Sequence, residues 1–536
     1  MANITELAKS ILAEHTEISN ILTNEKDSVL FRLNGSEYAL YFFEKNSFPT
    51  VCIIDNHKNY PHFSPKRATI DGKEYQILCL FEEGTLIEYI HTDEERIRIC
   101  VDRLIELTSL SNKEVVLEYQ KEFLFYWANA CTPNSKFAKK RYQIYLDDVN
   151  RFGWLEQQHY PRDVIRIAKP GKFFNDSKDC SRVSEIPVLF LPLISSKDII
   201  PPLPGEPWDS KQINRLVNGL EHQYISAEAY REISNISYSK KEIMLVFRLN
   251  DIVFSCIIVF RNAGTAKLSI KFESQIQDVI PVISNRCDYL YLNEQIGNTV
   301  SDKQITVVGA GSLGSYIISE LIYAGFRKIT IIDDDSFQYE NTFRHKNRYF
   351  SNGLPKVDLL KIELQHIHPE IEIIAIKEAL SADNVDRLRV LSSDIIVFTV
   401  GSSDLQLKLN RVLYNKDIKI PIYHAWLESD GQTSHVVAIR NYHQGCFECL
   451  FTDNDGNYVN NTLNVTNGQS KIIIRNGCGG TRVPYGNMTL LTATATLITA
   501  LKDSDDKNFV YSFCDNRILK NDFPQNMRCK CCGVQE

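Results

Sequence analysis

The spacing of hydrophobic residues divides the chain into three parts. Residues 1–112 combine a helical pattern with strand-like runs, which predicts a small α+β domain. Residues 113–290 mix aromatic-rich helical stretches, two β-rich runs and a proline-rich segment, so a mixed α+β linker or docking domain is expected. From 291 to 536, strands and helices alternate around a glycine-rich turn, the order typical of βαβ units on a parallel sheet. The expected fold class is a multi-domain α/β protein with a Rossmann-like C-terminal domain.

Three local patterns refine the N-terminal domain. Hydrophobic residues recur at near-helical spacing from Leu7 to Leu22 and predict a helix there. Two strand-like runs follow, joined by Asn34 and Gly35, which predicts a tight hairpin because both residue types tolerate positive φ. Thr92, with a glutamate three residues later, forms a capping-box sequence and predicts the start of a further helix.

Composition narrows the class of protein. The 536 residues are 43% hydrophobic and 24% charged, which is typical of a globular protein of several domains. A net charge of -7 argues against a nucleic-acid-binding surface, and no apolar run approaches the ~18 residues of a membrane span, so neither a nucleic-acid nor a membrane partner is expected. No secretory signal opens the chain and 14 cysteines are too sparse for a disulfide scaffold, so a cytoplasmic location is expected.

A glycine-rich turn in the C-terminal domain predicts a nucleotide-binding site. Gly309, Gly311 and Gly314 form G-x-G-x-x-G between an expected strand and an expected helix, where backbone N–H groups can approach phosphates. Asp333 and Asp335 follow the next strand, at the place of a ribose-hydroxyl acceptor. A nicotinamide-dependent dehydrogenase would share this pattern, so the turn alone does not identify the nucleotide.

The residues that follow favour a nucleoside triphosphate. Asn341, Arg344 and Lys356 place a polar group and two cations beyond the glycine turn, which suits three phosphates better than a nicotinamide dinucleotide. Asp404, further along, offers a carboxylate for Mg²⁺, the ion that bridges phosphate oxygens in such sites. The pattern therefore predicts ATP and Mg²⁺ as cofactors.

Paired cysteines predict a zinc site. Cys446 and Cys449 form one C-x-x-C, and Cys529 and Cys532 form another. Two such pairs can close a tetrahedral thiolate cage around Zn²⁺ with no open position for catalysis. Cys531 competes as a ligand because the tail holds three cysteines.

These C-terminal motifs together resemble the ThiF/MoeB/HesA and ubiquitin-activating family over residues 291–536. The resemblance implies ATP-dependent adenylation of a protein's C-terminal carboxylate, a structural zinc, and a homodimeric or pseudo-dimeric fold. The family's arginine, which reaches the partner subunit's ATP, has no counterpart here: Glu294 stands at its place, and Arg286 is the candidate substitute.

Cys478 is the first candidate nucleophile. It lies in RNGCGGTRVPYG, where glycines leave a thiol accessible, and Arg475 and Arg482 would favour the thiolate. In the resembling family a loop at this place carries the cysteine that accepts the acyl group as a thioester. An ordinary loop cysteine, or one used for sulfur transfer, is the alternative.

Cys79 is the second candidate nucleophile. The sequence around it resembles ubiquitin-conjugating enzymes, with a Pro-containing strand end, a His/Pro loop, and a hydrophobic–Cys–Leu motif before a helix. The resemblance implies that Cys79 receives the transferred acyl group. His62 stands where that family has His-Pro-Asn, but the asparagine thought to stabilise the oxyanion is missing. A buried strand cysteine is the alternative interpretation.

The order of these parts resembles bacterial fusions of conjugating-like and activating-like domains, encoded beside cGAS-like nucleotidyltransferases (CD-NTases) in CBASS anti-phage operons. That resemblance implies a relay: adenylation of a C-terminal glycine, thioester formation on Cys478, transfer to Cys79, and conjugation to a target amine. The activated partner would be a CD-NTase or a ubiquitin-like protein. Two other classes stay open, namely a sulfur-carrier or peptide-modifying adenylyltransferase whose N-terminal region only docks substrate, and a non-catalytic scaffold.

Overall fold

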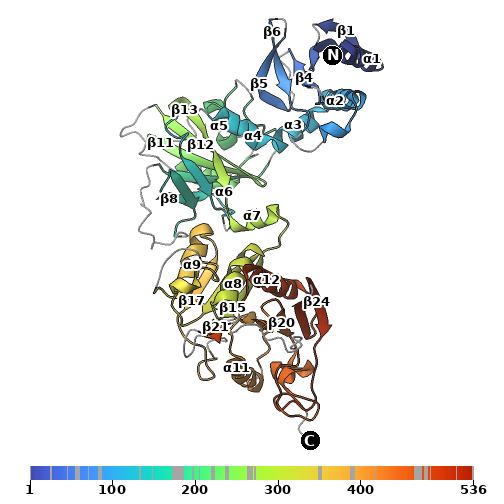
Figure 1. Cartoon of the computed structure of the whole chain (residues 1–536). Helices are drawn as coiled ribbons and strands as arrows, with labels where there is room; N and C mark the ends of the chain where they lie inside the picture. The colour runs from blue at the N-terminus through green and yellow to red at the C-terminus, as the bar shows by residue number, and fades with distance from the viewer. Residues whose placement is uncertain are drawn as a thin grey trace. The chain divides into compact units, whose positions relative to one another are not determined.

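The computed structural model describes the chain except for residue 1 and the following ranges: 25–26, 45, 55–60, 71, 82–86, 132–134, 148, 172–185, 196–197, 204–205, 219–223, 236–240, 262–269, 271–272, 348–352, 387–392, 417, 464–473, 476–480, 483, 515 and 534–536. The described residues separate into two compact units, one ending at Arg286 and the other beginning at Cys287 (Figure 1). This boundary lies four residues before the predicted start of the C-terminal domain. The division of the first unit at residue 112 stays a prediction.

A six-stranded antiparallel sheet begins the first unit. Its strand order is β1-β2-β3-β4-β6-β5, and α1 and α2 contribute to its core. The elements are α1 (Ala2–Leu12), β1 (Ile18–Asn24), β2 (Ser28–Leu33), β3 (Ser36–Tyr41), β4 (Thr50–Ile53), β5 (Phe63–Ile70), β6 (Lys73–Leu78) and α2 (Asp93–Thr108).

Two of the three local predictions for this domain are confirmed. Asn34 and Gly35 join β2 and β3 with φ of 51° and 81°, the positive values that a two-residue hairpin turn requires. Thr92 caps α2, exchanging hydrogen bonds with Glu95 as a capping box does.

The predicted helix from Leu7 to Leu22 is wrong in its second half. The helix ends at Leu12, and Ile18–Asn24 forms β1, paired antiparallel with β2. Ile18 is buried in this edge strand, whereas Leu22 is 62% exposed. Pairing with β2 therefore overrides the helical spacing of these short apolar residues.

An eight-stranded sheet forms the rest of the first unit. Its order is β13-β12-β11-β10-β8-β9-β7-β14, and the two predicted β-rich runs around Asp251 are its strands β11 and β12. The elements are α3 (Asn112–Lys121), α4 (Phe123–Ala130), β7 (Arg141–Ile144), β8 (Gly153–Tyr160), β9 (Val164–Ala168), β10 (Val188–Leu193), α5 (Ser210–Asn218), α6 (Ala227–Asn235), β11 (Glu242–Leu249), β12 (Ile252–Phe260), β13 (Ile276–Val282) and β14 (Ser284–Arg286).

The second unit is an α/β domain, as predicted. Five parallel strands in the order β17-β16-β15-β18-β19 continue into antiparallel β20, β23 and β24. The elements are α7 (Tyr289–Gln295), β15 (Ser301–Val308), α8 (Ser312–Tyr323), β16 (Phe326–Ile332), α9 (Lys356–Ile367), β17 (Glu372–Ile376), β18 (Ile395–Phe398), α11 (Ser403–Asn415), β19 (Ile422–Leu427), β20 (Ser434–Ile439), α12 (Asn487–Lys502), β23 (Phe509–Cys514) and β24 (Arg517–Asp522).

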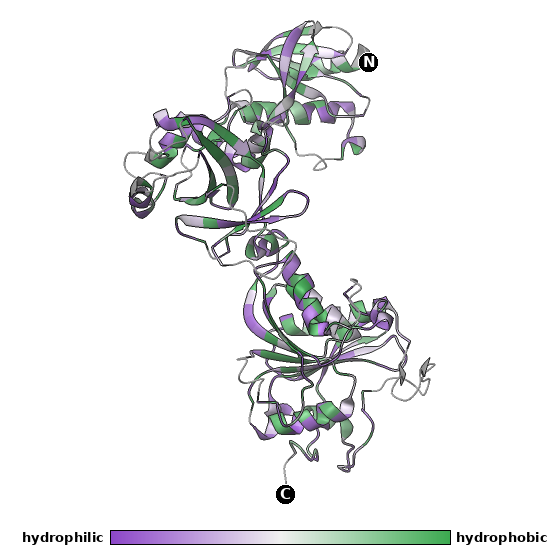
Figure 2. Ribbon diagram, turned by 90° about the vertical axis from the view of Figure 1, so that its left-hand side faces the viewer, coloured by the Kyte–Doolittle hydropathy of each residue, from purple (hydrophilic) through white to green (hydrophobic). Residues whose placement is uncertain are grey.

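Helices cover both faces of this sheet. Residues of α8, α9 and α12 pack with Ile305 and Val307 of β15 in one hydrophobic cluster, whereas residues of α11 pack with Val308 in another. Figure 2 shows hydrophobic residues concentrated along the interior strands. Burial on both faces explains why the parallel strands read as continuous apolar runs in the sequence. It also leaves their carboxyl ends as the open edge where a site can form.

Candidate functional site

The glycine turn lies at the carboxyl end of β15, where α8 begins. Gly309 has φ of 101°, and a Cβ there would come within 2.8 Å of the Thr399 hydroxyl oxygen. A Cβ at Gly314 would collide with the Gly309 carbonyl oxygen. The turn and α8 therefore pack against each other and against the end of β18 more closely than any side chain allows, as the motif predicts.

Asp333 fixes the turn from the neighbouring strand. Its Oδ2 accepts the Ala310 N–H at 2.6 Å, and its Oδ1 accepts the Asp335 N–H at 2.8 Å. Burial raises the pKa of Asp333, while the two backbone donors and the charge of Lys356 oppose that shift. The carboxylate thus braces the loop at the edge where a ribose was expected.

His345 also holds the glycine turn in place through hydrogen bonds. Its Nε2 donates to the Ala310 carbonyl oxygen at 2.9 Å, and its Nδ1 accepts the Asn347 N–H at 3.1 Å. Burial lowers its pKa to about 4, so the ring is neutral near pH 7. No sequence motif pointed to this histidine.

Three predicted polar residues converge beside the turn. Lys356 is buried at the start of α9, with its Nζ 2.6 Å from an Asp335 carboxylate oxygen. Asn341 is held by its Oδ1, which accepts the Gln338 N–H at 2.8 Å. The Nε of Arg344 is buried and has no hydrogen-bond partner among the described residues. Arg344 is thus a half-buried cation with unused donor capacity at its Nε, suited to an anionic ligand.

A cavity of about 640 Å³ opens at this edge of the sheet. Its size suits a nucleotide together with part of a second substrate. It is lined by Gly311, Ser312, Leu313, Asn341, Arg344, Lys356, Thr399, Val400, Gly401, Ser403, Gln406, Ala425, Trp426, Leu427, Glu428, Phe447, Phe451, Asn460, Asn461 and Tyr485.

Other predicted residues lie elsewhere. Asp404 is in the first turn of α11, 77% exposed, with its carboxylate 2.8 Å from Lys408 Nζ, and it is not among the described residues lining the cavity. Glu294 is exposed on α7 of the second unit. Arg286 ends the first unit in β14, with its guanidinium 3.7 Å from Asp251. The replacement of the family's arginine by Arg286 stays a prediction.

The paired cysteines form one cluster. The four sulfur atoms of Cys446, Cys449, Cys529 and Cys532 lie within 4.8 Å of one another, and the first three cysteines are buried. Four thiols converging in this way offer a donor set for a tetrahedral metal ion such as zinc, and they fit the ligand set that was predicted.

Asn410 connects the cluster to α11. Its Nδ2 donates to Cys446 Sγ at 3.4 Å and to Cys531 Sγ at 3.5 Å, while its Oδ1 accepts the Phe447 N–H. Cys531 thus contacts Asn410 rather than completing the set of four. N–H donation to sulfur stabilises thiolate ligands and orients them.

Cys79 lies at the carboxyl end of β6 and is exposed. Its N–H donates to the His62 carbonyl oxygen at 2.7 Å. Burial of the thiol raises its pKa and the Glu122 carboxylate raises it further, while Ser64 and Lys66 act in the opposite direction. The alternative that Cys79 is a buried strand cysteine is therefore wrong, because the residue is exposed. The groups around the thiol nevertheless disfavour its thiolate form.

The His62 ring is clamped between two carboxylates of the following helices. Its Nδ1 is 2.5 Å from Glu122 and its Nε2 is 3.2 Å from Glu118. Burial lowers the pKa of His62, but these two glutamates outweigh it and leave the pKa raised. His62 has φ of 73°, and the backbone N–H of the following residue, Phe63, donates to the Tyr126 hydroxyl at 2.6 Å. The histidine thus anchors the loop that holds Cys79 to α3 and α4.

Cys478 lies outside the described residues. The two-residue strands on either side of it, Ile474–Arg475 and Thr481–Arg482, pair antiparallel. Its role and its surroundings stay predictions.

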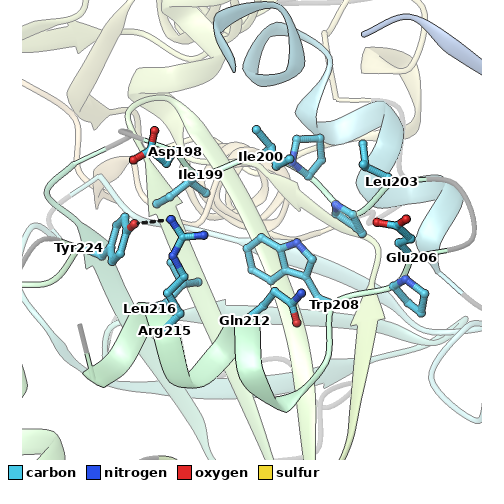
Figure 3. A pocket seen from close by; sticks show the side chains of 13 residues that line it. Asp198, Ile199, Ile200, Leu203, Glu206, Trp208, Gln212, Arg215, Leu216 and Tyr224 are labelled. Carbon is cyan, nitrogen blue, oxygen red and sulfur yellow. Dashed lines mark hydrogen bonds between the residues drawn. The ribbon is translucent and has the colours of Figure 1, made fainter. Parts of the chain in front are cut away.

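A smaller cavity of about 200 Å³ lies in the first unit beside the proline-rich segment (Figure 3). Trp208 and Ile199 contribute apolar surface, and Arg215 donates to the Tyr224 hydroxyl at 3.0 Å. It contains none of the predicted site residues.

Sequence reasoning missed the second wall of the larger cavity. Trp426 lies near the carboxyl end of β19 and Glu428 directly follows that strand, while Phe447 comes from the segment between the first two cysteines. The signal that points to the first two is topological: β19 is parallel to β18, so its carboxyl end meets the same edge. No motif marks Asn460, Asn461 or Tyr485.

Among the described residues, no helix is long and apolar enough to cross a membrane.

Comparison with known proteins identifies the second unit. The ThiF family model matches residues 292–530. A tRNA threonylcarbamoyladenosine dehydratase 2 of Saccharomyces cerevisiae is 32% identical over 133 residues, which are 24% of this chain and 30% of that protein. The ATP-dependent ubiquitin transferase-like protein Cap2 of Pseudomonas aeruginosa is 25% identical over 214 residues, which are 39% of this chain and 37% of that protein.

Similarity to solved structures is weaker. A crystal structure of E. coli MccB with MccA-N7isoASN is 20% identical, covering 43% of this chain and 67% of that one with a TM-score of 0.33. The matched regions span about a third of the length of the yeast dehydratase and of Cap2. The family match and the strand order that carries the glycine turn agree, and residues 292–530 form a ThiF family domain.

Proposed function

We propose that the chain activates the C-terminal carboxylate of a partner protein by ATP-dependent adenylation. The observation that carries the proposal is the cavity beside the glycine turn, which is lined by both Lys356 and Arg344, two cations suited to phosphates. The ThiF family match and the similarity to enzymes of ubiquitin-like activation support it.

The reaction joins a carboxylate to AMP. A carboxylate oxygen attacks the α-phosphorus, the bond to the β-phosphate oxygen breaks, and pyrophosphate leaves with the electron pair. Arg344 and Lys356 stabilise the negative charge that grows on the phosphate oxygens. Asp404 is the proposed carboxylate ligand of Mg²⁺, which would neutralise phosphate charge; it lies outside the described cavity lining and pairs with Lys408.

We also propose a relay through two thiols. Cys478 thiolate attacks the acyl-adenylate carbonyl carbon, and AMP leaves as a thioester forms. Cys79 then takes the acyl group by thiol exchange and releases Cys478. An amine finally attacks the Cys79 thioester, so that a C–N bond replaces the C–S bond and the proton returns to the sulfur. The exposed position of Cys79 at a strand end supports this role.

The partner is proposed to carry a C-terminal glycine. The order of the two expected domains, which resembles the CBASS fusions, favours a CD-NTase as this partner, and a ubiquitin-like protein has the same chemistry. The name of Cap2, a ubiquitin transferase-like protein, agrees with a protein partner of this kind. A homodimer through the ThiF domain is proposed from the resemblance of the C-terminal motifs to the ThiF/MoeB family.

An adenylyltransferase of the sulfur-carrier or peptide-modifying type is the second candidate. In that case the first unit would dock substrate and Cys79 would carry no acyl group. The raised pKa of the Cys79 thiol favours this candidate, because less thiolate is present near neutral pH.

Adenylation is tested by the conversion of α-labelled ATP to AMP. The full chain is incubated with an extract containing the proteins encoded beside it. Wild type should form AMP, while Lys356→Ala and Arg344→Ala should each reduce the rate by about 100-fold or more, as removal of transition-state charge contacts does. Lys361→Ala, which removes a half-buried lysine of the same helix that does not line the cavity, is the control. Equal rates for all four proteins would contradict the proposal.

A further inference from the structure

Glu428 lines the adenylation cavity directly after the end of β19, and its acidic side chain differs from the cations Arg344 and Lys356 that line the same cavity. Its side chain is 8% exposed, and among the described residues no lysine or arginine forms an ion pair with it. Burial raises its pKa, Trp426 opposes that shift by hydrogen bonding, and the charge of Asp430 adds to it. A buried acid without a cation costs stability, which is a reason to look for a ligand that it serves.

The neighbours of Glu428 orient its carboxyl group without neutralising it. Trp426 Nε1 donates to Oε1 at 2.7 Å. His435 Nε2 lies 3.4 Å from the same oxygen, and no hydrogen-bond partner for this nitrogen is found among the described residues. Burial lowers the pKa of His435 to about 4, so it brings no positive charge near neutral pH. The Ser429 N–H also donates to this carboxyl group. A carboxylate has about four acceptor positions, so the group keeps acceptor capacity beyond its bonds with Trp426 and Ser429.

The turn that carries Glu428 is fixed on several sides. The Glu428 N–H donates to the Thr433 carbonyl oxygen at 2.9 Å, and Asp430 accepts hydrogen bonds from the Gln432 and Thr433 N–H groups at 2.8 Å. The Gly431 carbonyl oxygen accepts the Thr489 hydroxyl at 2.8 Å, which joins the turn to α12. Glu428 thus stands at a preset position relative to the β19 strand end.

The strand order separates two chemically distinct parts of the cavity lining. Arg344 and Lys356 come after β16, whereas Glu428 comes after β19, and β15 and β18 lie between these two strands. The same cavity is also lined by Asn460, Asn461 and the aromatic residues Trp426, Phe447, Phe451 and Tyr485. A carboxyl-terminal peptide matches this arrangement, because it carries an anion at its end and N–H donors behind it.

We propose that Glu428 accepts a backbone N–H of the last or penultimate residue of the peptide whose carboxylate is adenylated. Repulsion by Glu428 directs the terminal carboxylate toward the cations, and the hydrogen bond sets how far the peptide enters. The aromatic walls favour residues without bulky side chains at these positions. Glu428 is a specificity-determining residue, and Trp426 positions it. This inference rests on the proposed adenylation and names how its acyl substrate is recognised.

The test uses pyrophosphate exchange into ATP by the full chain with synthetic peptides. The probes are N-acetyl-Gly-Gly-Gly and two counterparts in which the last or the penultimate glycine is sarcosine, which lacks the N–H. With wild type, one sarcosine peptide should lose about 10-fold or more in kcat/KM, the size typical of a hydrogen bond to a charged acceptor. Glu428→Ala should lower the all-glycine peptide by a similar factor and abolish the preference for glycine over sarcosine.

Matched variants separate recognition from folding. Glu428→Gln keeps the shape and a neutral acceptor, so it should keep part of the preference, and Trp426→Phe should raise the KM for peptide while the KM for ATP stays unchanged. Glu372→Ala, a change at an exposed position of β17, is the control and should behave as wild type.

Each outcome decides a different claim. Equal use of the three peptides by wild type, or an unchanged preference in Glu428→Ala, overturns the role of Glu428. If wild type binds ATP but catalyses no exchange with any peptide, the role of Glu428 is also overturned. AMP formation in the extract assay would in that case still support the proposed adenylation. Loss of ATP binding by wild type counts against the proposed function itself.

Discussion

At the scale of single residues, Cys79 shows how the environment sets the reactivity of a thiol. The Cys79 residue is exposed, yet its thiol is partly removed from water, and this partial burial and the Glu122 carboxylate both raise the pKa of the thiol. A neutral thiol resists stray oxidation and alkylation, and becomes a nucleophile only when a base or an incoming substrate changes its surroundings. Both candidate roles of the first unit depend on this balance.

Glu122→Gln should make Cys79 more reactive. Removing the carboxylate charge lowers the thiol pKa, so more thiolate is present at pH 7.5, while burial keeps the pKa above that of a free cysteine. The alkylation rate of the Cys79 peptide by iodoacetamide should rise about 2–5-fold, because the rate follows the fraction of thiolate. Peptide mass spectrometry measures it, with the exposed Glu106→Gln as control. An unchanged or slower rate would contradict the electrostatic explanation.

Gly314→Ala should abolish ATP binding and destabilise the second unit. The added Cβ collides with the Gly309 carbonyl oxygen and comes within 2.7 Å of the Thr399 hydroxyl, so α8 has to move away from the turn. Gly311→Ala is the matched control, because nothing lies within 4 Å of its Cβ. Thermal unfolding should shift downward by several degrees for the first variant only, since overpacking costs about 1–3 kcal/mol. Equal melting temperatures would contradict the packing argument.

Individual residues of the nucleotide end were predictable because each belongs to a motif with fixed spacing. Arg344 and Lys356 were found in this way, and both line the cavity. Glu428 was not, because its position depends on β19 lying beside β18, which the sequence does not display. His345 was missed for the same reason: its role is a contact with Ala310, 35 residues away.

At the scale of elements, hydrophobic pattern worked best where burial is two-sided. The strands β15, β16 and β18 and helix α8 were predicted because their apolar runs are continuous and their borders carry glycines or acids. The short segment Ile18–Asn24 was assigned to a helix because three apolar residues fit either period. Only its pairing with β2 decides between them, and this long-range contact leaves no local signal.

The cysteine cluster connects the segment after β20 to the C-terminal tail, so its metal should hold both in place. Cys449→Ser should reduce bound zinc from about one ion per chain to nearly none and lower the melting temperature by roughly 5–10 °C, because metal binding contributes to folding. Cys514→Ser, a cysteine outside the cluster, is the control. Metal analysis and calorimetry measure both effects, and a Cys449→Ser protein with full zinc would rule out this ligand set.

At the scale of the whole molecule, the break between Arg286 and Cys287 predicts two independently folding parts. Residues 287–536 expressed alone should fold cooperatively and bind ATP with an affinity within about threefold of the full chain, because every described residue that lines the cavity belongs to that unit. Calorimetry and titration with ATP measure this. An unfolded fragment, or one that needs residues 1–286 to bind ATP, would contradict it.

The central claim is that the two units act in sequence on one acyl group. The most direct measurement co-expresses wild type, Cys79→Ala and Cys478→Ala with the genomic neighbours, and detects ATP-dependent, thiol-labile adducts by non-reducing gel and intact mass. Wild type should form an adduct and Cys478→Ala none, and Cys79→Ala should form an adduct confined to the ThiF domain with no conjugated product. Unchanged adduct and product with Cys79→Ala would contradict the relay and leave the first unit as a docking module.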